Sequence, residues 1–302
     1  MAVAQTQIVI SALQKVHPGL EFRIRKVRTS GDRDRRTALW DLRSTGFFTT
    51  QVEDALLAGE ADFAVHSLKD LPTVEREGLR IAAVCNREYV EDCLVARDEI
   101  ERIEQLAAGA RIGTSSLRRV MQLRRLWPGL VAVPVRGNVG TRLRLVESRQ
   151  VDAVILARAG LERLGLGGRI SIAFDPAEFI PAAAQGALAV QTRLDDDATT
   201  ELIAAIDEPV ARTTTLAERG VLATMRCGCH APAGVYATIV KQDVHIHAFI
   251  CDLQGGNFIR RSAAGAVTEV CKLAEGLAHE LLAAGGAEIV ADLERQGSGK
   301  ED

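Results

Sequence analysis

The stretch Val151–Leu166, "VDAVILARAGLERLGL", decides the fold class of this 302-residue chain. The run VDAVIL predicts a short buried β-strand, and ARAGLERLGL predicts a polar bend followed by an amphipathic helix. Three other stretches repeat this unit: ADFAV leads into HSLKDLPT, ARIG into TSSLRRVMQLRRL, and LVAVPV into RGNVGTRLRLVES. Strands that alternate with helices at this spacing imply βαβ crossovers and a mostly parallel sheet, so we expect an α/β protein.

Changes in this pattern divide the chain into three predicted domains. The segment CNREYVEDCLVARDEI crosses from a first α/β domain into a second, and EFIPAAAQGALAVQTRL returns to the first. From about Pro209 the units give way to a helix, a cysteine loop, two strands and a last helix, which predicts a small α+β domain. We expect domain 1 to comprise residues 1–86 and 187–206, domain 2 residues 90–182, and domain 3 residues 209–302.

The charge of the middle segment indicates an anionic ligand. The whole chain has a net charge of -3, yet between Arg111 and Arg163 there are eleven arginines, no lysine and three acids. Arginine used without lysine favours bidentate recognition of carboxylate or phosphate groups. Aromatic residues make up 4% of the chain and no nucleic-acid-binding motif is present. Because few rings are available to stack on bases, nucleic acid is a poor candidate for the anion.

Polar residues gather at the turns that follow the predicted strands, where α/β folds bind ligands. In GTSSLRR, hydroxyls and backbone amides at a helix start can attract an anion, or a serine can simply cap the helix beside two solvated arginines. In HSLKDLP, a carboxylate can hold a cationic intermediate, or it can cap the turn or pair with its neighbouring lysine. The residues concerned are Ser67, Lys69, Asp70, Thr114, Ser115, Arg118, Arg119, Arg136, Arg142, Arg158 and Arg163.

The loop CGCHAPAGVY, Cys227–Tyr236, carries two thiols one residue apart beside a histidine. Its spacing is compatible with a metal ligand set, half of a disulfide, a redox pair or a single nucleophile. A zinc site needs further ligands, and His245 and His247 are better explained as one face of a strand. Six cysteines without a signal-like N-terminus indicate reduced thiols in the cytoplasm. No apolar run is long enough to span a bilayer, so we expect no membrane partner.

Six motifs, in order, resemble the porphobilinogen deaminase (hydroxymethylbilane synthase) family. They are AVHSLKDLPT, IGTSSLRR, RGNVGTRL, LARAGLERLG, PAAAQGALAVQ and the loop from Cys229 to Pro232. The resemblance extends from about Gln5 to the C-terminal helix. It implies two domains of the type II periplasmic-binding-protein kind around a cleft, followed by the small third domain. It also implies a monomeric transferase with a dipyrromethane cofactor held by a thioether to Cys229.

The resemblance also implies the reaction and the site. The family joins four porphobilinogen units head to tail, releases ammonia at each addition, and then hydrolyses off the linear tetrapyrrole. By resemblance, Asp70 is the catalytic carboxylate, Arg163 and Gln185 bind substrate, and no metal takes part. Every pyrrole carries an acetate and a propionate, which gives the basic and hydroxyl residues anionic partners. The cofactor would contact Ser67, Lys69, Thr114, Ser115, Arg118, Arg119, Arg136 and Arg142.

Two departures from the family pattern keep a second hypothesis open. Family members begin with a strand and loop resembling RIGTRxSxLAxxQ, whereas this chain starts inside that motif at MAVAQ, so we expect the first strand to be missing. The family's GGKGLF loop has a lysine where this chain has Thr45 in RSTGFF. Either the start lies upstream of Met1, or the chain is a degenerate, non-catalytic anion-binding or sensor paralogue on the same scaffold.

Overall fold

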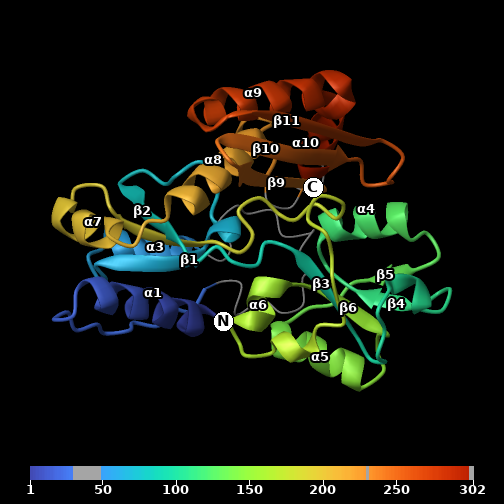
Figure 1. Ribbon diagram of the computed structural model, residues 1–302, viewed down its shortest axis with the longest axis horizontal. Helices are drawn as coiled ribbons and strands as arrows, with labels where there is room; N and C mark the ends of the chain where they lie inside the picture. The colour runs from blue at the N-terminus through green and yellow to red at the C-terminus, as the bar shows by residue number, and fades with distance from the viewer. Residues whose placement is uncertain (30–48, 229–230, 299–302) are drawn as a thin grey trace.

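The computed structural model describes residues 1–29, 49–228 and 231–298. Its strands form three sheets, and each sheet has helices of its own (Figure 1). We call these assemblies the first, second and third units, in the order in which the chain enters them. Thr45 lies outside the described residues, so the expectation about its loop stays a prediction.

The first unit is a three-stranded sheet in the order β1-β8-β2. The central strand β8 is antiparallel to both neighbours. On one face, Val9 and Leu13 of α1 pack against Leu188 and Val190 of β8. The elements of this unit are α1 (Ala2–Val16), α3 (Thr50–Leu57), β1 (Phe63–Ser67), the 3-10 turn η2 (Leu68–Asp70), β2 (Leu79–Cys85), β8 (Leu188–Arg193) and α7 (Asp197–Ala204).

The second unit is a five-stranded sheet in the order β5-β4-β6-β3-β7. Both of its faces are covered, because one hydrophobic cluster forms around Val154 and Leu156 and another around Ile155 and Leu123. Its strands are β3 (Asp92–Ala96), β4 (Arg111–Gly113), β5 (Val131–Val133), β6 (Ala153–Ala157) and β7 (Ile172–Ala173). Its helices are η3 (Ile103–Gln105), α4 (Leu117–Leu126), α5 (Val139–Glu147), α6 (Arg158–Glu162) and η4 (Gly167–Arg169).

The third unit is an antiparallel sheet in the order β11-β10-β9, with helices packed on one face. Figure 1 shows α9 above this sheet and the other two units below it. Pro209 lies in the first turn of α8, where the missing N–H costs nothing. The elements are α8 (Pro209–Thr224), β9 (Ala233–Val240), β10 (Asp243–Cys251), β11 (Phe258–Ala266), η5 (Val267–Glu269), α9 (Val270–Leu281), the π-helical turn η6 (Leu282–Gly286) and α10 (Ala287–Ser298).

The predicted fold class, α/β with a separate small C-terminal part, is confirmed. The expectation of mostly parallel pairing is wrong. Among the described residues, the only parallel pairs are β4 with β5 and β4 with β6, whereas β3 and β8 are antiparallel to every strand they pair with. The reason is the route of the chain: β3 enters the second sheet from the first unit, and β8 returns from the second unit into the first. Each of these strands therefore runs against the local βαβ direction.

A buried carboxylate on α8 joins the three units. Glu218 Oε1 accepts hydrogen bonds from Arg87 Nη2 at 2.6 Å and from the Ala237 N–H of β9 at 2.7 Å. Its Oε2 accepts from the N–H of Ala184 at 2.6 Å. Ala184 has a φ of 61°, a left-handed conformation that is costly for alanine, and this contact holds it there. The segment that returns the chain to the first unit is thus fixed to the third unit.

None of the helices in the described part of the chain combines the length and the apolar character that are needed to cross a membrane.

Candidate active site

The turn η2 follows β1 directly and presents the predicted catalytic carboxylate. Pro72 lies two residues beyond the turn and has no N–H with which to continue a helix. Asp70 is exposed at the end of the turn. The Nζ of the preceding residue, Lys69, donates to Gln185 Oε1 at 3.1 Å.

Asp92, the first residue of β3, is fully buried and binds two arginines of α4. Its Oδ2 lies 2.7 Å from Arg118 Nη2, and its Oδ1 lies 2.7 Å from Arg119 Nη2. The second Nη of each arginine donates to a backbone carbonyl: Arg118 to Ile180 at 2.7 Å and Arg119 to Ile155 at 3.0 Å. Burial alone would raise the pKa of Asp92, but the two arginine charges outweigh it and hold that pKa well below its usual range. Asp92 therefore stays ionised and neutralises one of the two arginine charges.

Gln185 connects the turn of the first unit to this buried ion pair. Its Nε2 donates to Asp92 Oδ1 at 2.9 Å, while its Oε1 accepts from Lys69. The next residue, Gly186, has a φ of 90°, and a Cβ there would come within 2.7 Å of a backbone oxygen. Only glycine fits this bend, so the bend fixes the direction of the Gln185 side chain.

Lys69 lies close enough to the other charged groups to respond to them. The pKa of Lys69 is lowered to about 8, mainly by burial. The nearby charge of Asp70 raises this pKa, and the charge of Arg119 lowers it. Asp92 and Arg118 have smaller effects of opposite sign. An anion that binds beside Lys69 would stabilise the charged form of its side chain.

The turn between β5 and α5 and the first part of α5 add two more arginines, Arg136 and Arg142. Gly137 in this turn has a φ of 99°, and Asn138 caps α5 by accepting the Thr141 N–H at 2.9 Å. Arg142 Nε donates to the Gly137 carbonyl at 3.0 Å. Burial, together with the charges of Arg119 and Arg136, lowers the pKa of Arg142 to about 10. Arginines from two separate strand–turn–helix segments therefore lie within electrostatic range of one another.

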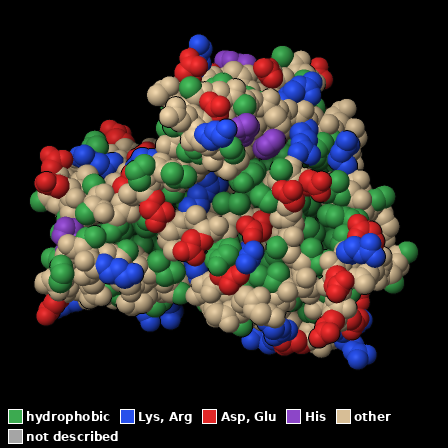
Figure 2. All heavy atoms as spheres, in the orientation of Figure 1, with side chains coloured by type: hydrophobic (Ala, Val, Ile, Leu, Met, Phe, Trp, Pro, Cys, Tyr) green, Lys and Arg blue, Asp and Glu red, His purple; other side chains and the backbone are tan. Residues whose placement is uncertain are grey.

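We call these five residues the cationic cluster: Lys69, Arg118, Arg119, Arg136 and Arg142. The buried Nε of Arg119 and the buried Nε and Nη2 of Arg136 make no hydrogen bond with any described residue. Buried donors without an acceptor are costly, so this arrangement suits a ligand that brings oxygen atoms to them. Figure 2 shows a recess where the third unit meets the other two, with basic and hydrophobic side chains in it. The cluster can bind several carboxylates, which is the chemistry expected of the predicted cofactor.

The predicted hydroxyl groups already have protein partners. Ser115 Oγ donates to the Val135 carbonyl and accepts the Val135 N–H at 3.0 Å, so it ties α4 to the neighbouring turn. Thr114 is fully buried, and its Oγ1 accepts a hydrogen bond from the Ser116 N–H at 3.3 Å. Ser67 accepts from Gln5 Nε2 at 2.6 Å. These contacts shape the turns, and their predicted contact with cofactor stays a prediction.

Arg163 contacts the connection between the first two units. Its guanidinium donates to the carbonyl and the side chain of Asn86, at 2.9 and 3.0 Å, and to the Gly186 carbonyl at 2.5 Å. Arg163 thus links, by hydrogen bonds, the two segments that connect the first two units. Arg158, which the sequence did not assign to the site, pairs with Glu91 at 2.8 Å and with Glu162 at 2.9 Å.

The cysteine loop is described only in part. Cys227 is buried in the core of the third unit, and burial raises the pKa of its thiol to about 12. A thiol of this kind is a poor nucleophile at neutral pH. Cys229 lies outside the described residues, so its assignment stays a prediction. Within the described ranges, no three histidine, cysteine or acidic side chains are grouped as a metal site would require.

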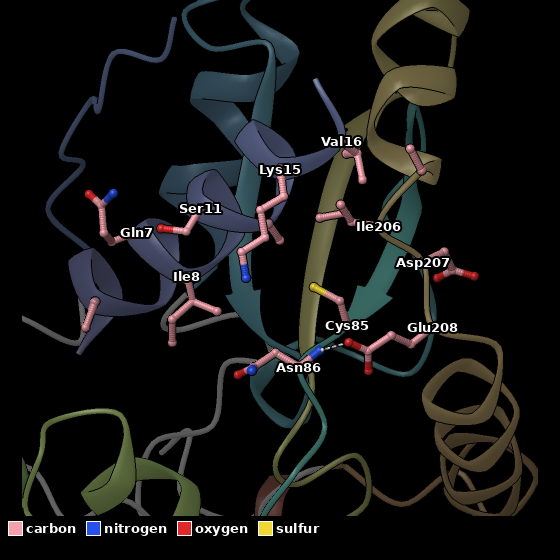
Figure 3. Close-up of a pocket in the computed structure, with 13 residues that line it drawn as sticks. Gln7, Ile8, Ser11, Lys15, Val16, Cys85, Asn86, Ile206, Asp207 and Glu208 are labelled. Atoms are coloured by element: carbon pink, nitrogen blue, oxygen red, sulfur yellow. Dashed lines mark hydrogen bonds between the residues drawn. The ribbon is translucent and has the colours of Figure 1, made fainter. Parts of the chain in front are cut away.

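A cavity of about 720 Å³ lies between α1 and the end of β2, away from the cationic cluster. Figure 3 shows Lys15 of α1 and the sulfur of Cys85 directed into it. Burial raises the pKa of Cys85 to about 12, which makes this thiol unreactive as well. Glu208, on its wall, already accepts the Asn86 N–H at 2.9 Å. None of the predicted site residues lines this cavity.

Two residues that contact the candidate site were not singled out in the sequence. Asp92 orients both arginines of α4, and Gln5 of α1 contacts Ser67 beside the turn η2. The signal for Asp92 was an aspartate at the head of the otherwise apolar strand DCLVA. Such a residue needs a buried cation, and arginines were the available partners.

Two family models match the chain. The model of the porphobilinogen deaminase dipyromethane cofactor binding domain matches residues 1–201, and that of the porphobilinogen deaminase C-terminal domain matches residues 212–283. The porphobilinogen deaminase of Carboxydothermus hydrogenoformans is 39% identical over 98% of this chain and 94% of its own length. The porphobilinogen deaminase of Deinococcus radiodurans is 40% identical over 96% of this chain and 94% of its own.

Among solved structures, the chain is similar to the second substrate-binding domain of a putative amino acid ABC transporter from Streptococcus pneumoniae. The TM-score is 0.40 and the sequence identity 16%, over 67% of this chain and 80% of the other.

Proposed function

The chain belongs to the porphobilinogen deaminase family of tetrapyrrole-building transferases, and we propose that it is a hydroxymethylbilane synthase. It would join four porphobilinogen units head to tail, release one ammonia at each addition, and hydrolyse off the linear tetrapyrrole. The observation that carries this proposal is the set of buried guanidinium donors on Arg119 and Arg136 that have no hydrogen-bond partner among the described residues, with Arg119 within electrostatic range of Lys69 in the turn of Asp70. The comparisons give no support to the non-catalytic alternative.

The cationic cluster fits a dipyrromethane and a growing pyrrole chain. Each pyrrole ring brings an acetate and a propionate, so every addition brings two more carboxylates to the site. The open donors of Arg119 and Arg136, with the Lys69 ammonium, are the groups that would bind them. When bound through Cys229, the cofactor supplies the free pyrrole α-carbon at which the chain grows.

Asp70 is the carboxylate placed for the chemical step. It is exposed at the end of η2, whereas Asp92 is buried and already neutralised by two arginines. Loss of ammonia leaves the incoming pyrrole electron-poor, and the Asp70 carboxylate would stabilise that positive charge. The same carboxylate would accept the proton that a pyrrole α-carbon releases when the new carbon–carbon bond forms.

Asp92 and Gln185 would position the groups that bind carboxylates. Asp92 fixes the two α4 arginines, and Gln185 holds Lys69 while also donating to Asp92. Ser67, Thr114 and Ser115 would shape the turns that carry the site, and Arg163 would hold the connection between the first two units in position for substrate.

We further propose that the three units are the three domains of the enzyme, with the boundaries expected from the sequence. The cofactor cysteine would then come from the third domain, while the carboxylate binders come from the first two. Glu218 supports this arrangement, since it ties β9 of the third unit to the returning segment at Ala184.

We propose a cytoplasmic monomer that takes porphobilinogen and does not bind nucleic acid or membranes. The large apolar side chains that are exposed are distributed over many elements, from Val3 of α1 to Val240 of β9, which argues against an obligate interface. The described cysteines are unpaired, as expected in a reducing compartment. Light scattering should give the mass of one chain, 32.5 kDa; a dimer mass would contradict the proposal.

Intact-mass spectrometry and an activity assay test the function. The purified protein should carry a two-pyrrole adduct, give the colour reaction of a free pyrrole with an acidic aldehyde reagent, and convert porphobilinogen to tetrapyrrole and ammonia. Cys229→Ser should lose both the adduct and the activity. Cys227→Ala removes a neighbouring thiol that is buried in the core, and should keep both.

Asp70→Asn separates catalysis from cofactor binding. It keeps the shape of the turn, and turnover should fall by about 10²- to 10³-fold because one charge-stabilising group is lost. Asp62→Asn, an exposed aspartate just before β1, should stay within about twofold of wild type, as surface substitutions usually do. If the wild-type chain carries no adduct, the proposed function is wrong. If Asp70→Asn turns over like Asp62→Asn, the proposed role of Asp70 is wrong.

A further inference from the structure

A second, smaller cavity lies between the second and third units, away from the catalytic turn. Its volume is about 290 Å³. The second unit contributes Gln122, Arg125 and Glu178 to its wall, and the third unit contributes Phe258, Arg260 and Arg261 from the start of β11. We call it the interdomain arginine pocket. In Figure 1, α4 lies beside the end of the β10–β11 hairpin, which is where these residues meet.

The charge of this pocket is not balanced by the protein. Three arginines face one acid, Glu178, and none of the three forms an ion pair with a carboxylate in the described ranges of the chain. By contrast, the arginines at positions 118, 119 and 158 all have acidic partners. Unpaired guanidinium groups that converge on one cavity attract anions.

Two of the three guanidinium groups are held in place by contacts that use few of their N–H donors. Arg125 lies over the Phe258 ring, 4.7 Å from its centroid, and that ring stacks on the fully buried Phe249 at 4.7 Å and 7°. Arg260 donates one hydrogen bond to the Ala177 carbonyl. The remaining donors of both groups are available in a fixed orientation, which lowers the entropy lost when a ligand binds.

The pocket is connected to the cationic cluster through the backbone of one residue, Ile180. Gln122 Nε2 donates to the Ile180 carbonyl at 3.0 Å, and its Oε1 accepts the Ile180 N–H at 2.7 Å. Arg118 Nη1 donates to the same Ile180 carbonyl at 2.7 Å. An anion in the pocket would contact both units at once and hold the third unit against the helix that carries Arg118.

We propose that the interdomain arginine pocket binds a small organic anion with two or more carboxylate or phosphate groups. A cavity of about 290 Å³ is large enough for such an anion. Three guanidinium groups and one acid leave a net positive charge, which two anionic groups would neutralise. This site would be separate from the one that builds the pyrrole chain. It would stabilise the contact between the second and third units.

Isothermal titration calorimetry with citrate and, separately, with inorganic pyrophosphate tests the proposal on the intact protein. The cationic cluster also attracts anions, so the assignment depends on variants. Arg125→Gln and Arg260→Gln should each weaken one binding event by about 10- to 100-fold, because each removes a charge-assisted pair of hydrogen bonds. Arg124→Gln is the matched control: it removes the same charge from the same helix at an exposed position outside the pocket.

The outcomes separate the possibilities. The proposal is supported if citrate, pyrophosphate or both bind and this binding is lost in Arg125→Gln and Arg260→Gln. The binding should be kept in Arg124→Gln and in Arg136→Gln. Which of the two anions binds identifies the preferred group. Binding that is lost only in Arg136→Gln belongs to the cationic cluster and overturns the proposal. If the affinity falls equally in Arg124→Gln and Arg125→Gln, the effect is one of general charge, and the proposal is overturned. If no saturable binding is found, the site does not exist, and the proposal is overturned as well. The readout is binding, so it does not depend on whether the proposed activity is correct.

Discussion

Substituting Asp92 by asparagine should destabilise the second unit more than any other single carboxylate-to-amide change there. Asn keeps the shape of Asp92 but leaves Arg118 and Arg119 charged, with 4% and 6% of their surfaces exposed. Two buried cations within reach of one another then have no counterion. Removing one partner of a buried ion pair typically costs about 3 to 5 kcal/mol, and we expect the free energy of unfolding to fall by that amount.

Urea denaturation followed by tryptophan fluorescence measures this loss. Trp127 packs against Phe174 and Phe179 in the second unit, so it reports on the unit that contains Asp92. A Trp40→Phe background leaves it as the only tryptophan. Urea is uncharged and does not screen the ion pair as guanidinium would. With an m-value of about 2 kcal/mol/M, the midpoint should fall by about 1.5 to 2.5 M.

The neighbouring residue provides the control. Glu91→Gln breaks the pair with Arg158, whose side chain is 31% exposed. Because water can solvate that guanidinium, the loss should be about 0 to 1 kcal/mol. If Asp92→Asn shifts the midpoint no more than Glu91→Gln does, the two α4 arginines do not depend on Asp92, and our account of how they are oriented is incorrect.

Three further predictions follow from the same site and its surroundings. The pKa of Lys69 is lowered to about 8, so the affinity for a carboxylate ligand should decrease between pH 7 and 9 as its charge is lost; Lys69→Gln should remove this pH dependence, and an unchanged profile would exclude Lys69 as a binder. Burial lowers the pKa of His66 from 6.5 to about 4, so the unfolded chain takes up the proton first as the pH falls. The unfolding free energy should then decrease by about 3 kcal/mol between pH 6.5 and 4, relative to His66→Gln in parallel urea titrations; equal slopes would show that His66 is not the group responsible. Arg119→Lys should lose at least about tenfold in turnover, because Arg119 binds the Ile155 carbonyl and Asp92 through two separate nitrogens, and a single ammonium nitrogen lacks that planar fork; wild-type turnover would mean that positive charge alone is sufficient.

The sequence predicted the parts of the site that depend on neighbours along the chain. The strand–turn–helix units placed Asp70 and Lys69 after one strand and the arginine pairs after others, and the structure has turns at these positions. Such patterns are readable because helix and strand periodicity, glycine bends and proline breaks act over a few residues. The fold class followed from the alternation of these units. The direction of strand pairing did not, because it depends on how β3 and β8 cross between the units.

Only the tertiary structure decided which charged groups have partners and which are open. Arg118, Arg119, Arg136 and Arg163 read alike in the sequence, yet Arg163 donates to the Asn86 and Gly186 carbonyls, while Arg136 has two buried donors with no partner in the described part of the chain. Asp92 lies 27 residues from Arg119 and 93 from Gln185, distances over which no local pattern carries information. Electrostatic partnership depends on separation in space and on burial, and both are set by how the three units pack together.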